Sequence, residues 1–137
     1  MDRKAYIEEV MDHCKHPRNR GSLANADFCA QDANPLCGDE IKICGKVQGG
    51  RLAEIKFDGH GCAICIAASS MLTESAKGKS LKSALGIKRE AVLADFGGKM
   101  SPVRTKCALL ALKTLKIGIC GFLGEKGVKK GKMYESL

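Results

Sequence analysis

The chain has 137 residues, and its hydrophobic content of 45% is enough to bury the core of one domain without added staples. Acidic residues occur near the N-terminus where a secretion signal would need an apolar stretch, and no run of about 18 apolar residues indicates a membrane span. We therefore predict one cytoplasmic domain over residues 1–137 that does not act at a membrane.

The formal net charge is +8, but the lysines are dispersed, apart from a basic tail at about residues 121–137. The chain has two tyrosines, four phenylalanines and no tryptophan, and these do not alternate with the basic residues. Proteins that bind single-stranded nucleic acid combine a basic groove with aromatic stacking, so we expect no nucleic-acid partner. The basic tail is interpreted as a solvated segment or as a docking segment for an acidic protein surface.

Eight cysteines occur along the chain, at positions 14, 29, 37, 44, 62, 65, 107 and 120. A reducing compartment keeps thiols free, so we do not expect these cysteines to form disulfides. They are predicted to be buried hydrophobic residues, metal ligands or reactive thiols.

The first element predicted by the sequence is a helix that ends at His16-Pro17. The helical spacing is that of the apolar residues Tyr6 or Ile7, Val10, Met11 and Cys14. Cys14 lies on this apolar stripe and is expected in the core. The two histidines, His13 and His16, are expected at the surface or as helix caps.

Between Asp39 and Asp58 the pattern changes to strict alternation, which predicts a β-hairpin with its turn at Gln48-Gly49-Gly50. The residues predicted to face the core are Ile41, Ile43 and Val47 on the first strand, and Ala53, Ile55 and Phe57 on the second. Cys44 falls on the opposite, lysine-bearing face and is predicted to be an exposed or partly covered thiol.

The rest of the chain is predicted to be helical. The expected helices cover residues 62–76, 81–85, 88–96 and 102–119, with the last one starting after Ser101-Pro102. Strands followed by helices in one small domain predict an α+β fold, in which helices pack on one face of a small antiparallel sheet.

Three cysteines lie at the boundaries of these elements, where side chains from different segments can converge. Cys37 stands in a turn before the hairpin, and Gly38 lets Cys37 and Asp39 point into the same space. Cys62 lies at the junction of strand and helix, and Cys107 lies in the first turns of the last helix. Helix starts favour thiolate over thiol, and thiolate is the form that binds metals.

The set Cys37, Asp39, Cys62 and Cys107 offers three thiolates and one carboxylate. Such a set can complete a tetrahedral Zn²⁺ site or hold an iron–sulfur cluster. The single carboxylate makes the site more exchangeable than four thiolates would, which suits a protein that gives its cargo away.

A rival site would use Cys62 and Cys65, with His60 beside them. A structural zinc site needs a second matching pair, and a redox pair expects a parallel βαβ unit, so the Cys-x-x-Cys spacing is weak evidence here. Cys65 is instead predicted to pack in the core of its helix. His60 is expected to act as an outer group or proton carrier of the site, and Lys106 to pair with Asp39 or to lower the pKa of a thiol.

Four segments together make the chain resemble the NifU/IscU/SufU family of iron–sulfur cluster assembly scaffolds over nearly its whole length. The residues that carry the resemblance are Asp12-His13 with His16-Pro17-Arg18-Asn19 and Gly21, then Asn34-Pro35-Leu36-Cys37-Gly38-Asp39, then Gly59-His60-Gly61-Cys62-Ala63-Ile64 followed by Ala67-Ala68-Ser69-Ser70-Met71-Leu72-Thr73-Glu74, and finally Pro102-Val103-Arg104 leading to Cys107-Ala108.

The resemblance implies a scaffold protein, not an enzyme with catalytic residues. It implies that sulfur comes from a cysteine desulfurase and iron from a donor, and that a [2Fe–2S] cluster is assembled and passed to apo-proteins. The implied metal and cluster ligands are Cys37, Asp39, Cys62 and Cys107, with Zn²⁺ in the same site when no cluster is present. An Hsp70-type chaperone is a further implied partner, because Ser101-Pro102-Val103-Arg104 partly matches the recognition segment of the IscU branch.

The branch within the family stays open. The IscU branch has a histidine at the position of Lys106 and the SufU branch has a lysine, yet the SufU branch usually carries an insertion that the span from Cys62 to Cys107 is too short to hold. The alternative function is therefore a zinc-dependent sulfur acceptor for the desulfurase. A plain structural zinc protein is a third, more distant hypothesis.

Overall fold

The computed structural model of the protein describes residues 3–125. Most of the predicted basic tail therefore lies outside the described residues. The elements in chain order are α1 (Arg3–Lys15), β1 (Phe28–Asn34), β2 (Asp39–Gln48), β3 (Arg51–His60), α2 (Ala63–Ala76), α3 (Leu81–Leu85), α4 (Arg89–Ala94) and α5 (Pro102–Glu125).

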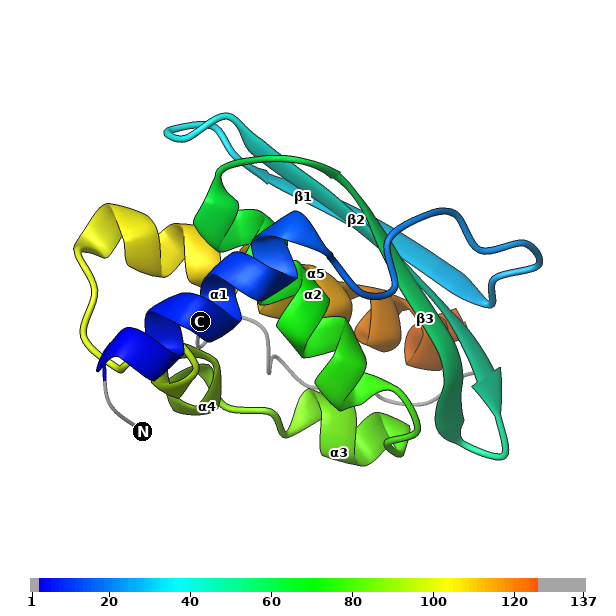
Figure 1. Ribbon diagram of the computed structural model, residues 1–137. Helices are drawn as coiled ribbons and strands as arrows, with labels where there is room; N and C mark the ends of the chain where they lie inside the picture. Colours follow the sequence, from blue (N-terminus) through cyan, green and yellow to red (C-terminus); the bar gives the residue numbers. More distant parts are fainter. Residues whose placement is uncertain (1–2, 126–137) are drawn as a thin grey trace.

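The three strands form one antiparallel sheet in the order β1-β2-β3. Helix α5 packs against β1 and β2, and α2 packs against β3 and against α5. Helix α1 lies over α2 on the side away from the sheet, as Figure 1 shows. The α+β prediction, with helices covering one face of a small antiparallel sheet, is thereby confirmed.

The core lies between the sheet and helices α2 and α5. Side chains with almost no exposed surface come from both strands of the predicted hairpin and from the last helix; they include Ile41, Ile43, Leu52, Ile55, Phe57, Leu112, Leu115 and Ile119. Burying large aliphatic and aromatic side chains contributes about 1.5–3 kcal/mol each, so this layer is the main source of stability.

Strand β1 was not predicted, because its sequence FCAQDAN lacks the β-branched residues and the clean alternation of a typical strand. Its burial nevertheless alternates, with Phe28 and Asn34 buried and Cys29 exposed. Pairing with β2 over seven residues and packing against α5 make it a strand. Tertiary contacts therefore override a weak local preference.

The prediction that Ala53 is a core residue is wrong. Leu52 is the core residue at this place, and it has no exposed surface. The ladder between β2 and β3 shifts between Lys46 and Val47, so that Lys46 faces Glu54 whereas Val47 faces Leu52. Ala53 is the extra residue of this β-bulge, and a bulge moves the alternation by one residue.

The first helix covers the predicted Tyr6, Val10 and Cys14 only partly, and its most buried residue is one that was not predicted to be buried. Ile7 and Met11 are exposed and Cys14 is half-buried, whereas His13, expected at the surface, is 5% exposed. The Nδ1 atom of His13 lies 2.7 Å from the Ser70 hydroxyl of α2, and Ser70 also accepts a hydrogen bond from the backbone N–H of Arg18. The histidine is buried because this hydrogen bond satisfies it.

Helix α5 runs to Glu125, beyond the expected end at about residue 119, so the first residues of the predicted tail are helical. Over Pro102–Gly124 this helix is long and apolar enough to cross a membrane by length and composition alone. In its apolar 18-residue window, 67% is buried inside the protein. Its apolar character is that of a core helix.

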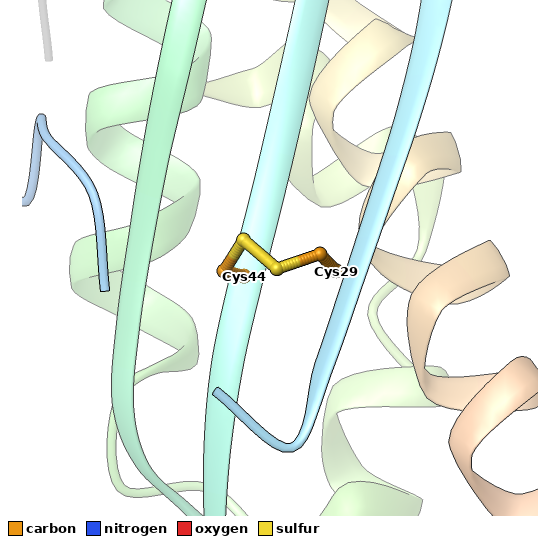
Figure 2. Close-up of a disulfide and its surroundings, with 2 residues drawn as sticks. All are labelled: Cys29 and Cys44. Carbon is orange, nitrogen blue, oxygen red and sulfur yellow. A yellow bond between two sulfur atoms is a disulfide. The ribbon is translucent and has the colours of Figure 1, made fainter. Parts of the chain in front are cut away.

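The expectation that the chain contains no disulfide is wrong. Cys29 of β1 and Cys44 of β2 form a disulfide, which Figure 2 shows as a bridge between the two neighbouring strands. The register places the two residues directly opposite each other, with their Cα atoms 4.1 Å apart. Cys44 is accordingly 7% exposed and is not the free surface thiol that was predicted. The pairing was invisible in the sequence because β1 itself was not predicted.

The ring of Phe28 fixes the packing between β1, β2 and α5. A Cβ atom at Gly45 would lie 2.4 Å from the ring, and a Cβ atom at Gly118 would lie 2.7 Å from it. The aromatic ring thus occupies the space that side chains at these two glycines would need. This close approach seats α5, and with it Cys107, against the first two strands.

We predict that Gly118→Ala lowers the free energy of unfolding by about 1–2 kcal/mol, because overpacking against Phe28 outweighs the gain in helix propensity of alanine over glycine. Gly121→Ala is the matched control, since no atom lies within 4 Å of its added Cβ in the same helix. The control should be neutral or more stable by up to about 1 kcal/mol in urea unfolding. Equal stabilities of the two variants would contradict the packing argument.

Candidate metal and cluster site

The turn between β1 and β2 presents the first two predicted ligands. The backbone N–H of Cys37 donates a hydrogen bond to the carbonyl oxygen of Asn34 at 3.2 Å, which closes a tight turn with Pro35 at its second position. Gly38 has a φ of +70°, a conformation that glycine adopts without strain. The chain then enters β2 at Asp39, so that Cys37 and Asp39 lie on the same side of the turn.

The structure brings together three of the four predicted ligands. The sulfur atoms of Cys37 and Cys107 and a carboxylate oxygen of Asp39 all lie within 4.8 Å of one another. The Sγ atoms of Cys107 and Cys37 are 3.3 Å apart, although the residues are 70 positions apart in the chain. The amide Nδ2 of Asn34, which is buried at the end of β1, lies 3.8 Å from the Cys107 sulfur.

Asp39 gives the strongest evidence for a bound cation, because its carboxylate is buried and only one of its two oxygens accepts a hydrogen bond. It is 1% exposed, and its Oδ1 atom accepts a hydrogen bond of 2.9 Å from the backbone N–H of Cys62. Its Oδ2 atom is buried with no hydrogen-bond partner. A buried carboxylate oxygen without a partner is costly, and a bound cation would satisfy it. The donor set therefore fits a metal ion or an iron–sulfur cluster.

Cys62 stands at the edge of the site. It caps the N-terminus of α2 in an extended conformation, and its side chain is exposed. Its backbone is bonded to Asp39, but its sulfur does not belong to the group whose ligand atoms are all mutually within 4.8 Å. The fourth predicted ligand is thus adjacent to the other three without joining them.

Two glycines allow the backbone before Cys62 to approach the site. Gly59 has a φ of +130°, and an added Cβ would lie 2.1 Å from the carbonyl oxygen of Glu40. At Gly61 an added Cβ would lie 2.7 Å from Oδ1 of Asp39 and 3.1 Å from Cβ of Cys65. Any side chain at these positions would push the Cys62 backbone away from Asp39.

The pKa of Cys107 is raised above that of a free cysteine, which is the reverse of the shift expected from its place near a helix start. Burial is the largest cause, and the neighbouring Asp39, Cys37 and Cys62 raise it further. Cys107 lies in the sixth position of α5, covered by the sheet, where the helix N-terminus no longer dominates. Negative groups crowd this site, so without a cation the thiol keeps its proton.

Cys65 is a core residue, as predicted, although it neighbours the site. It has no exposed surface, and burial raises its pKa to about 12, with further contributions from Asp39 and Cys62. Its sulfur is not part of the group in which the ligand atoms of Cys37, Asp39 and Cys107 all lie within 4.8 Å of one another. The Cys-x-x-Cys spacing is therefore explained by one residue at the site and one in the core.

The two predicted outer groups, Lys106 and His60, are both exposed. Lys106 is exposed and borders a cavity of about 350 Å³ that also includes Asn34 and Leu36. Within residues 3–125 no ion pair joins Lys106 to Asp39, so the proposed pairing is not present. His60 lies in β3 opposite Glu40, with its Nε2 atom 3.9 Å from that carboxylate and its side chain 73% exposed. Its role in proton transfer stays a prediction.

Two residues that help to build the site were missed as contributors by sequence reasoning. Asn34 contacts Cys107 from the last position of a strand that was not predicted. Gly61 leaves room for the Asp39 carboxylate, because an added Cβ would lie 2.7 Å from its Oδ1 atom. The available signals were the Asn-Pro turn dipeptide and the glycine two residues after another glycine.

The fold and the site define a small α+β protein in which two thiols and a buried carboxylate form a donor set that fits a metal ion or a cluster. Residues 5–129 match the family described as the NifU-like N terminal domain, and the chain belongs to this family. The family resemblance noted from the sequence is thereby confirmed.

Several relatives are similar over most of the chain. The iron–sulfur cluster assembly scaffold protein IscU 1 of Archaeoglobus fulgidus is 41% identical over 122 residues, covering 89% of this chain and 79% of the relative. The zinc-dependent sulfurtransferase SufU of Bacillus subtilis is 35% identical, covering 83% and 88%. A crystal structure of the N-terminal part of a nitrogen-fixing NifU-like protein from Brucella abortus shares the fold, with a TM-score of 0.71, 17% identity and coverage of 91% and 99%.

We predict that zinc affinity rises with pH, because Zn²⁺ binds thiolates and must displace the proton held by Cys107. The raised pKa of Cys107 keeps this proton in place through the neutral range. Competition with a chromophoric chelator between about pH 6 and pH 8 should show about a tenfold gain per pH unit for each proton released. In Cys107→Ser the slope should fall by one proton, and a pH-independent affinity would refute the argument.

Proposed function

We propose that this protein is a scaffold on which a [2Fe–2S] cluster is assembled and from which it is passed to apo-proteins. The observation that carries the proposal is the group of half-buried Cys37 with buried Asp39 and Cys107, in which one carboxylate oxygen lacks a hydrogen-bond partner. Membership of the NifU-like family and the similarity to proteins named as cluster assembly scaffolds support it. Iron and sulfide are cargo in this function, so no catalytic residue is assigned.

We assign the ligands as Cys37, Asp39, Cys62 and Cys107. Cys62 supports the assignment by its position, because its backbone already binds Asp39 and its exposed side chain is free to turn toward an arriving ion. The carboxylate is the hard ligand of the set, and it holds iron less firmly than a thiolate holds it. Asp39 is therefore the position at which the cluster exchanges.

Sulfur arrives in this proposal as the outer atom of a persulfide on a cysteine desulfurase. A cysteine thiolate of the scaffold attacks that outer sulfur, the donor cysteine leaves as a thiolate, and the sulfur remains on the scaffold as a new persulfide. The exposed Cys62 and the half-buried Cys37 are open to this attack, whereas Cys107 is 2% exposed. We expect one of the first two to accept the sulfur.

Partners would dock around the turn that carries Cys37. Leu36 is 73% exposed at this turn, and Val103, near the start of α5, is 50% exposed. Exposed apolar side chains beside a reactive site suit transient protein contacts. We propose that the desulfurase and the apo-protein acceptors dock on this surface. An iron donor supplies the metal. The segment that contains Val103 is the proposed binding site of an Hsp70-type chaperone. We propose a cytoplasmic location for these steps.

A second function has support of its own, which is zinc-dependent transfer of desulfurase sulfur without storage of a cluster. The relative from Bacillus subtilis is named as a zinc-dependent sulfurtransferase, and the resemblance noted above gives this branch a lysine at the position of Lys106. Three thiols and a carboxylate also suit tetrahedral zinc. Such a protein would act by holding one thiolate at the zinc site until the donor persulfide arrives.

We predict that Cys37→Ser, Cys62→Ser and Cys107→Ser each lower the iron and sulfide retained after anaerobic reconstitution by roughly tenfold or more, because each removes a ligand. The absorption of the cluster and the iron and sulfide contents provide the measurement. Cys14→Ser is the matched control, since this half-buried cysteine lies on α1 and outside the proposed ligand set.

Unchanged cluster contents in all three ligand variants would show that the assignment is wrong. A different outcome would favour the second function: the native chain would form no stable chromophore, and added zinc-loaded protein would strongly raise the turnover of a cysteine desulfurase. Loss of that stimulation on zinc removal would complete the case for the sulfurtransferase.

We further predict that Asp39→Ala slows the release of a bound cluster by about tenfold, because it removes the exchangeable ligand. The rate of transfer from the reconstituted protein to an apo-ferredoxin, followed by circular dichroism, is the measurement. Faster transfer from the variant than from the native protein would count against the proposed role of this carboxylate.

A further inference from the structure

We propose that Cys29 and Cys44 form a second sulfur site, a thiol–disulfide exchange pair that takes a dithiol reductant as its substrate. The closed disulfide joins β1 to β2, and the turn between these two strands carries Cys37 and leads into Asp39. Reduction of the disulfide loosens this β1–β2 hairpin. The inference concerns a different face of the molecule from the cluster site and does not depend on the function proposed above.

The pair lies on the face of the sheet that the helices leave uncovered. Along β2, Asp39, Ile41 and Ile43 face the helices, whereas Cys44 has the opposite orientation, with Lys42 and Lys46. Figure 2 shows the two sulfur atoms between neighbouring strands, with the helices on the far side of them. Since Cys44 is five residues along the strand from Asp39 and on its other face, the two sulfur sites cannot share a ligand.

The two sulfurs of the disulfide differ in their access to solvent. Cys29 is an exposed residue of the edge strand, whereas Cys44, on the central strand, is 7% exposed. An incoming thiolate therefore reaches the sulfur of Cys29, and Cys44 is the leaving group. This asymmetry gives the exchange a defined direction of attack.

Cations surround the leaving group. Lys56 of β3 is directly opposite Cys44, and Lys42 and Lys46 are two residues away on the same face of β2. The acids of this face are engaged, because Glu54 pairs with Lys77 at 3.6 Å and Asp58 lies 3.8 Å from Arg20. Among residues 3–125 no ion pair engages Lys56. A cation beside a sulfur stabilises its thiolate and so makes it a better leaving group.

The proposed exchange balances with a dithiol as the reductant. One thiolate of the dithiol attacks Sγ of Cys29, the bond between the two protein sulfurs breaks, and Cys44 leaves as a thiolate that takes up a proton. In the mixed disulfide, one sulfur comes from the reductant and the other from Cys29. The second thiol of the reductant attacks the reductant's sulfur, and Cys29 leaves as a thiolate that takes up a proton. The reductant ends as a disulfide, and two electrons pass to the protein pair.

The disulfide closes a loop of chain that contains part of the proposed cluster site. They are 15 residues apart, and the enclosed segment contains Asn34, Cys37 and Asp39. β1 is an edge strand whose hydrogen-bonded neighbour in the sheet is β2. A cross-link between these strands limits local opening of the turn that presents two proposed ligands.

The pair can be tested in the full-length protein equilibrated with mixtures of reduced and oxidised dithiothreitol. Alkylation of free thiols followed by mass spectrometry locates the disulfide, and the experiment is run on the native chain and on a Cys37→Ser, Cys62→Ser, Cys107→Ser variant. We expect Cys29 and Cys44 to become protected together and reversibly in both proteins. A pair that stays alkylated in every mixture, or that forms only when the ligand cysteines are present, would overturn the proposal.

The direction of attack has a separate test in single variants treated with glutathione disulfide. Cys29 in Cys44→Ser should form a mixed disulfide at least about tenfold faster than Cys44 in Cys29→Ser, because only the former is exposed. In the native chain, Lys56→Gln should slow reduction several-fold relative to Lys82→Gln, an exposed lysine on α3. Equal rates in both comparisons would refute the assigned roles.

Hydrogen exchange provides the structural readout. Amides of β1 and of the turn before Asp39 should exchange about tenfold faster in the reduced protein than in the oxidised one, with α2 as the internal reference. Cys29→Ser should match the reduced protein in either buffer. Identical protection of β1 in the two redox states would show that the disulfide does not hold the hairpin.

Discussion

The hydrogen bond from the backbone N–H of Cys62 to Oδ1 of Asp39, 2.9 Å long, joins the two halves of this molecule's site. One end lies where β2 begins and the other where α2 begins, so the bond fixes the sheet relative to the helix that covers it. The Oδ2 atom of the same carboxylate is buried without a hydrogen-bond partner. A cation bound at this oxygen would offset the cost of burying it. Gly61 is required because a side chain there would occupy the space of the carboxylate.

Cys107, the third member of the site, is brought to it by the packing of helix α5. Helix α5 lies against the first two strands because the Phe28 ring fills the space left by Gly45 and Gly118. That seating brings the Cys107 sulfur to 3.3 Å from Cys37. Burial and the neighbouring Asp39, Cys37 and Cys62 then raise the pKa of the Cys107 thiol and keep it protonated. Stability and chemistry are thus coupled, since the contacts that bury the core also set the charge state of the ligands.

The sheet separates two kinds of sulfur chemistry by the alternation of its side chains. Asp39, on the face toward the helices, belongs to the proposed ligand group, whereas the opposite face carries the disulfide of Cys29 and Cys44 among lysines. Because Cys37 and Asp39 lie in the same β1–β2 hairpin as the disulfide, a change in the oxidation state of the disulfide is expected to alter the order of these two residues. The proposed exchange of cargo at Asp39 would respond to such changes, because it depends on the position of this one carboxylate.

The sequence by itself determined the class of fold, most helices, the hairpin of β2 and β3, and the four positions proposed as ligands. These follow from local periodicity and from turn residues, which act within a few positions of the chain. The tertiary structure decided the strand β1, the exchange of Ala53 for Leu52 in the core, the burial of His13 and the disulfide of Cys44. Each of these depends on a partner distant in the sequence, whether a facing strand, the Ser70 hydroxyl or Cys29. Local patterns show which face of a segment is apolar, but they cannot show what that face, or the opposite one, will meet.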